Sequence, residues 1–274
     1  MARMATVWDR TIEFLADNLP GLLPLAMLTI FLPNSVQQNL ASAATAATPG
    51  LKLGLSLLTI ALVMLTLWGK LAITAMALGR VAGSDSPAGI ASRRLLPAIG
   101  TLALFGLIVL ALLTPPFFVL ATHSFDLATL LTPAQAIMPQ SAKTLFAIAV
   151  LVVVPIGTWL MARIYLVLIP VVVAERHGTR AISQAFMLSR GLFWRILGVL
   201  ILYAIVAGVA ELAVRTVFGS IFELVVGGTG PLSLAKILTS IVSGAVSCAF
   251  TVLATAFCAK LYLATSGQDD LTLT

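Results

Sequence analysis

The chain has 274 residues and a formal net charge of +6; 60% of its residues are hydrophobic and 9% are charged. Soluble domains carry roughly a quarter charged residues, so this composition excludes an ordinary soluble globular protein. The basic residues lie at the ends of long apolar runs and form no dense polar patch. This distribution argues against nucleic acid as a partner and favours contact with anionic lipid headgroups.

Six apolar segments are candidates for crossing the bilayer, which takes about 20 helical residues. We place them approximately at residues 18–35, 53–79, 96–121, 144–173, 195–217 and 234–263. The first is short and contains Pro20, Pro24 and Pro33, so it could be a tilted span, a kinked span or a re-entrant segment. The predicted fold is an all-α integral membrane protein with a single polytopic domain over residues 1–274.

The distribution of Lys and Arg distinguishes these topologies. If the first segment crosses, the N-terminus, residues 80–95, residues 174–195 and the C-terminus share one side of the membrane. That side then carries ten basic residues and the other side four, whereas a re-entrant first segment gives eight and six. Because Lys and Arg concentrate on the cytoplasmic side, we expect six spans with both termini in the cytoplasm and no cleaved signal peptide.

One pattern occurs three times along the chain. Partly polar stretches that begin near residues 11, 86 and 179 each lead into a span, and a second span then returns the chain to the same side. The pattern predicts three units, each an amphipathic interfacial helix followed by a helical hairpin. Loops that precede membrane helices are commonly amphipathic, so both true duplication and coincidence remain open.

The polar connections also predict a basic face at the membrane surface. In the third stretch, Arg180 and Gln184 lean to one side of a helix and Phe186 to the other, which is typical of a helix that lies in the interface. Anionic phospholipid is the expected partner of this face, together with a protein partner on the cytoplasmic side. The residues of this basic face are Arg93, Arg94, Arg180, Arg190, Trp194 and Arg195.

The stretch from Ala162 to Leu202 combines a proline near the end of a span (Pro170), an acidic residue and a glycine after it (Glu175 and Gly178), and a basic-Gly-x-Phe-Trp-Arg-x-x-Gly sequence that begins at Arg190. In these elements the chain resembles the bacterial glycerophosphoryl diester phosphodiesterase membrane domain family, six-helix inner-membrane proteins of unknown function. The segment SPAGIASRRLLPAIG is similar to that family's second cytoplasmic connection. The resemblance implies a multi-pass protein of the bacterial inner membrane, linked to envelope or lipid homeostasis and without the catalytic phosphodiesterase domain.

The residue chemistry argues against an enzyme. Phosphodiester hydrolysis needs clustered carboxylates and histidines, but the two histidines, His123 and His177, fall on opposite sides of the membrane in the predicted topology. The spans contain no HExxH motif, and no P-loop is present. Cys248 and Cys258 are ten residues apart in one apolar run, which suits packing residues better than a redox pair or a metal site. We therefore expect no cofactor, no metal and no catalytic residues.

Three charged residues fall inside the predicted spans: Lys70, Arg163 and Glu211. Charges in hydrocarbon are costly unless they are paired or solvated, so these residues are the candidate site. One interpretation is a structural ion pair between Arg163 and Glu211, with Lys70 extended towards the cytoplasmic headgroups. The other is a polar cavity in which two cations face one acid and bind an anionic group such as a lipid phosphate.

Two functional classes are compatible with these features. The first is a non-enzymatic membrane domain that binds lipid or protein partners. The second is a small transporter or flippase-like carrier of an anionic lipid or solute that uses the three intramembrane charges. Few other polar residues fall in the spans, which favours the first class. The hydroxyls that a transport path would use are Ser56, Thr59, Thr66, Thr158 and Ser247.

Overall fold

The computed structural model describes residues 4–44, 48–79, 86–122, 140–160, 164, 166–174, 178–188, 193–227 and 233–266. Within these ranges every element is a helix, as the composition predicts. The elements are α1 (Met4–Ala26), the π-helical turn η1 (Met27–Phe31), α2 (Leu32–Ala44), α3 (Pro49–Ala77), α4 (Pro87–Thr122), α6 (Gln140–Leu160), α7 (Leu166–Val173), α8 (Thr179–Leu188), α9 (Phe193–Val226) and α10 (Leu234–Ser266).

Five of the described helical segments are long and apolar enough to cross a membrane, which confirms the predicted class of multi-pass, all-helical membrane protein. They are Met4–Leu40, Gly50–Ala77, Pro87–Pro115, Phe193–Val226 and Leu234–Ser266. A shorter apolar segment, Thr144–Leu160, lies in α6. The span predicted at 144–173 covers α6 and α7, and residues 161–163 and 165 lie outside the described residues.

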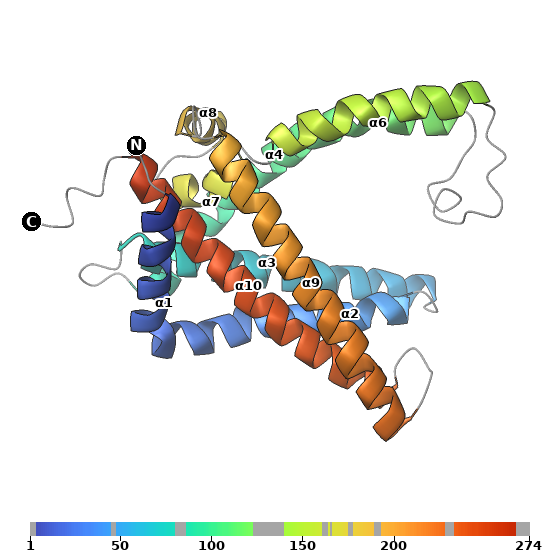
Figure 1. Cartoon of the computed structure of the whole chain (residues 1–274), viewed down its shortest axis with the longest axis horizontal. Helices are drawn as coiled ribbons and strands as arrows, with labels where there is room; N and C mark the ends of the chain where they lie inside the picture. The colour runs from blue at the N-terminus through green and yellow to red at the C-terminus, as the bar shows by residue number, and fades with distance from the viewer. Residues whose placement is uncertain are drawn as a thin grey trace, which may run out of the picture.

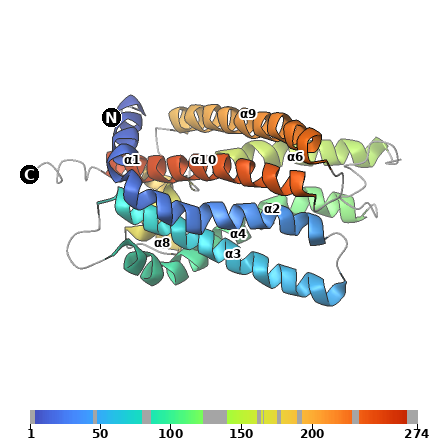
Figure 2. The same ribbon diagram turned by 90° about the horizontal axis from the view of Figure 1, so that it is seen from below.

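The first predicted segment, 18–35, does not coincide with one element. It begins inside α1 and ends inside α2, and η1 separates the two helices. Figures 1 and 2 show the first part of α1 running across the direction of α2, and the chain changes direction within α1, before η1. Pro20 and Pro24 lie inside α1 and lack the N–H that an α-helical hydrogen bond needs, which gives the bend a physical cause.

Six of the helices pack in three antiparallel pairs: α2 with α3, α4 with α6, and α9 with α10. In Figure 1 these pairs converge at the end where α1, α7 and α8 lie, and the α4–α6 pair diverges from the others away from that end. In Figure 1 the first residues of α1 and the last residues of α10 are both at the convergent end. The packed core is consequently concentrated at one end of the molecule.

The core is formed where the helices converge. Leu71 and Ile73 of α3, Val171 of α7 and Leu261 of α10 are fully buried. At the divergent end the apolar side chains are exposed, and Leu224 of α9 is 86% exposed. Apolar side chains are compatible with lipid, so these divergent helices are suited to hydrocarbon rather than water.

Aromatic contacts hold α1 against α10 at the convergent end. The Trp8 and Phe257 rings have centroids 6.1 Å apart, and the ammonium of Lys260 lies 4.9 Å from the centroid of the Phe14 ring. The second geometry is that of a cation–π interaction. These contacts fix α1, whose first part lies across α2, against the end of α10.

Small residues allow the helices to approach closely. A Cβ atom added at Gly69 of α3 would collide with the side chain of Thr29, whose hydroxyl donates to the Leu25 carbonyl at 2.7 Å. A Cβ atom at Gly244 of α10 would collide with the hydroxyl oxygen of Ser35. Close approach at glycine is the usual way in which membrane helices gain packing energy.

We expect Gly244→Ala to lower the free energy of unfolding in mixed micelles by about 1–3 kcal/mol, because the new methyl group overpacks the α2–α10 contact. Ser35→Ala should remove this penalty in the double variant. Among the described residues the buried Ser35 hydroxyl has no hydrogen-bond partner, so Ser35→Ala alone should cost little. Gly208→Ala, where nothing lies within 4 Å of the added atom, is the control. Equal effects of Gly244→Ala with and without Ser35 would contradict this packing.

Candidate functional site

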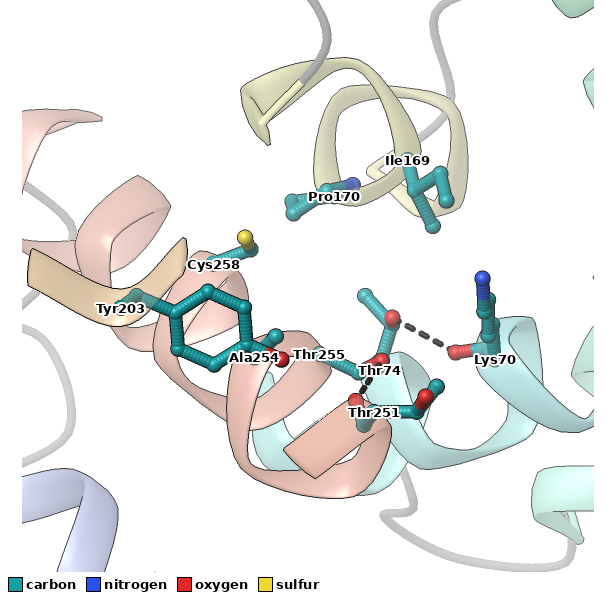
Figure 3. A pocket seen from close by; sticks show the side chains of 9 residues that line it. All are labelled: Lys70, Thr74, Ile169, Pro170, Tyr203, Thr251, Ala254, Thr255 and Cys258. Atoms are coloured by element: carbon teal, nitrogen blue, oxygen red, sulfur yellow. Dashed lines mark hydrogen bonds between the residues drawn. The ribbon is translucent and has the colours of Figure 1, made fainter. Parts of the chain in front are cut away.

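A cavity of about 180 Å³ lies among four helices at the inner edge of the packed core. Its residues come from α3, α7, α9 and α10, as Figure 3 shows. They are Lys70, Thr74, Ile169, Pro170, Tyr203, Thr251, Ala254, Thr255 and Cys258. We refer to this cavity as the Lys70 pocket.

The pocket lies within the length of α3, whose segment Gly50–Ala77 is long and apolar enough to cross a membrane. Lys70 precedes the end of α3 at Ala77 by seven residues, which places it about 10 Å along the helix from its end. The buried residues Leu71 and Ile73 follow it directly and anchor this part of α3 in the core. The backbone beneath the lysine is therefore held rigidly while its side chain enters the cavity.

Lys70 is the one charged side chain among the described residues that line the pocket. In Figure 3 its ammonium extends towards α7, on the side of Ile169. Within the described part of the chain, no hydrogen bond or ion pair reaches this ammonium. A charged group within a membrane-spanning helix is costly when it has no partner.

The hydroxyl groups of the pocket donate their protons to the backbone. Thr74 donates to the Lys70 carbonyl at 2.7 Å, and Thr255 donates to the Thr251 carbonyl at 2.7 Å. Thr251 donates to the Ser247 carbonyl at 2.8 Å. From α9, Tyr203 donates to the Phe250 carbonyl of α10 at 2.9 Å. Because a hydroxyl has one proton and two lone pairs, these four groups present acceptors to the cavity.

The two cysteines have different surroundings. Cys248 is buried, and its thiol donates to the Ala26 carbonyl at 3.6 Å. Cys258 lines the Lys70 pocket. Among the described residues, no three His, Cys, Asp or Glu side chains are grouped in a way that could hold a metal ion. The polar side-chain groups of the pocket are therefore one ammonium, four hydroxyls and one thiol.

Glu211 belongs to a different polar cluster. Its carboxylate accepts a hydrogen bond from Arg215 Nε at 2.8 Å and another from the Ser243 hydroxyl. Glu211 follows Tyr203 by eight residues, or about 12 Å along α9, and it does not line the Lys70 pocket. Arg163 lies outside the described residues, so its pairing with Glu211 stays a prediction.

The residues of the predicted basic face lie on α4, α8 and α9. Arg93, Arg180 and Arg195 are exposed, Arg94 is half-buried, and Arg190 lies outside the described residues. Trp194 is 79% exposed at the beginning of α9.

A hydrogen bond links the residue that precedes α8 to α4. The Gly178 N–H donates to the Thr101 hydroxyl at 2.9 Å, and Gly178 has a φ of 62°, a conformation that favours glycine. This bond fixes the position of α8, which carries Arg180, relative to α4, which carries Arg93.

Sequence reasoning identified Lys70 but missed Tyr203, Thr251 and Thr255. One signal was present: Thr251, Thr255 and Cys258 follow an i, i+4, i+7 spacing, which places them on one face of α10. An i, i+4 spacing likewise relates Lys70 to Thr74 on α3. The hydroxyls proposed from sequence for a transport path do not line the pocket, and Thr59, Thr66 and Thr158 donate to their own helices.

No protein-family model, curated protein or solved structure matches this chain.

We expect Glu211→Met to lower the melting temperature in detergent. The substitution leaves the Ser243 hydroxyl, whose residue is 1% exposed, without its acceptor, which costs about 1–3 kcal/mol. Glu223→Met is the matched control on α9, because Glu223 is exposed and its carboxylate forms no hydrogen bond or ion pair with another described residue. Equal melting temperatures for the two variants would show that the Glu211 cluster does not stabilise the α9–α10 pair.

Proposed function

We propose that this chain is a non-enzymatic membrane protein that binds the anionic headgroup of a phospholipid in the Lys70 pocket. The observation that carries the proposal is the Lys70 ammonium, which belongs to a helix long and apolar enough to cross a membrane and has no partner among the described residues. A phosphate group beside it would supply the missing counter-charge and accept charge-assisted hydrogen bonds.

The size and surroundings of the pocket favour a lipid. A cavity of about 180 Å³ is smaller than the roughly 300–1,000 Å³ that a drug-sized ligand occupies, so it suits a headgroup rather than a whole amphiphile. Leu202 and Val206, beside Tyr203 on α9, are apolar and exposed. Acyl chains outside the cavity would contact such surfaces, whereas a free solute would leave them unused.

We place the protein in the bacterial inner membrane with six spans and both termini in the cytoplasm. The family resemblance supports the location, and the three helix pairs α2–α3, α4–α6 and α9–α10 support three hairpins. The direction of α1 across α2 supports an interfacial first helix. The exposed Arg93 and Arg180, near the convergent end, suit the cytoplasmic headgroups.

A carrier of the same anionic group is the second candidate. The observation that favours it is α7, an eight-residue helix with Pro170 inside it, which lines the pocket. Short or proline-interrupted helices beside a site within the membrane are typical of secondary transporters.

The topology is tested by cysteine labelling in intact spheroplasts, in a background with both native cysteines replaced by alanine. With six spans, Thr48→Cys should react with a membrane-impermeant maleimide from outside, and Ser86→Cys should react only after the cells are opened. Thr48 immediately precedes α3, whereas Ser86 follows the other end of α3 and immediately precedes α4. If neither cysteine reacts before the cells are opened, or if Ser86→Cys does, the proposed orientation is wrong.

Lipid binding is tested by native mass spectrometry of protein released from gentle detergent into a mixture of phospholipids. Wild type should retain anionic phospholipid, and Lys70→Met should weaken this retention by about tenfold or more, because a charge-assisted hydrogen bond is lost. Lys52→Met, an exposed lysine near the other end of α3, should retain lipid as wild type does.

A second arm of the same experiment distinguishes a lipid from a free anion. Soluble glycerol phosphate should not displace the bound lipid, since it lacks acyl chains. Displacement by glycerol phosphate would assign the pocket to a solute and support the carrier. Equal retention by wild type and Lys70→Met would refute a function based on Lys70.

A further inference from the structure

We infer that the headgroup bound at Lys70 carries hydrogen-bond donors of its own: it is a phosphodiester that bears a hydroxyl or amine group. This inference rests on the proposed function and specifies its ligand. It comes from the hydrogen-bonding groups that line the pocket: the Lys70 ammonium and, weakly, the Cys258 thiol can donate to a ligand, whereas four hydroxyls are set to accept.

The first step concerns the hydrogen bonds that the hydroxyls of the pocket already donate. Thr251 and Thr255 donate to carbonyls of their own helix, at 2.8 and 2.7 Å. Tyr203 donates across to the Phe250 carbonyl of α10. For any of these groups to donate to a ligand, it would have to give up a bond that it already makes in a region without water. A ligand that donates to their lone pairs requires no such loss.

The second step is the placement of the ammonium. Lys70 has three donors and no acceptor, and in the described part of the chain no hydrogen bond or ion pair engages them. A ligand acceptor with negative charge is therefore complementary to Lys70, and ligand donors are complementary to the threonines. A simple anion would satisfy only the first requirement.

The third step is the geometry. Lys70 is on α3, whereas Thr251 and Thr255 are on α10, and the cavity lies between them (Figure 3). The ammonium extends towards α7, away from the hydroxyls. A headgroup in this pocket would place its phosphate beside Lys70 and its terminal hydroxyl or amine beside α10. Because the Lys70 ammonium and the Thr251 and Thr255 hydroxyls come from different helices, they would orient such a ligand in the pocket.

Two lipids of equal charge test the inference. Phosphatidylglycerol and phosphatidylmethanol are both singly charged phosphodiesters, but the phosphatidylmethanol headgroup has no donor. With matched acyl chains in direct competition, measured by native mass spectrometry of wild type, phosphatidylglycerol should bind about threefold to tenfold more tightly, which corresponds to one hydrogen bond.

The Thr251→Val, Thr255→Val double variant should remove this preference and leave the binding of phosphatidylmethanol unchanged. Thr239→Val is the control on the same helix, because its hydroxyl also donates to its own backbone, at 2.8 Å from the Ala235 carbonyl, but does not line the pocket. It should keep the wild-type preference.

The outcomes separate the two proposals. Equal binding of the two lipids by wild type, with loss of both in Lys70→Met, would overturn the inference about donors and leave the proposed function standing. A preference for phosphatidylmethanol would overturn the inference in the same way. No Lys70-dependent binding of either lipid would overturn both. The comparison of the two lipids on wild type does not depend on the folding of any variant.

Discussion

The hydrocarbon of a bilayer offers no hydrogen-bond partners, and this constraint governs the whole structure. The described elements are helices. Hydroxyl groups within them donate to the backbone carbonyl four residues earlier, as in Thr59, Thr158 and Thr216. The Glu211 carboxylate satisfies the same constraint because it accepts hydrogen bonds from Arg215 and Ser243. No described residue pairs with the Lys70 ammonium, although its side chain lines a cavity within the helices.

The architecture separates two physical tasks. At the convergent end, buried residues such as Leu71, Val171 and Leu261 pack against one another and position the short helices α7 and α8. At the divergent end, the helices present apolar side chains outward and gain little from one another, as expected when lipid is as apolar as the side chains. The Lys70 pocket lies at the edge of the packed region, so its walls are held firmly beside surfaces that suit acyl chains.

Packing also explains how a polar pocket is tolerated. Close approach at Gly69 brings α3 against η1, and close approach at Gly244 brings α10 against α2. These contacts fix the rotation of α3 and α10, which carry Lys70 and the pocket threonines. Tyr203 then joins α9 to α10 through its bond to Phe250. The pocket is therefore a consequence of helix packing.

The sequence by itself determined the fold class, the segments apolar enough to span, and the presence of Lys70 and Glu211 within them, because hydropathy and charge are local properties of the chain. The bend within α1 depended on where prolines interrupt a continuous helix. Only the tertiary structure decided which polar residues meet. It set Lys70 beside Thr251 and Thr255, and Glu211 beside Ser243, because these neighbours depend on how each helix is rotated against the next, which spacing along one helix does not specify.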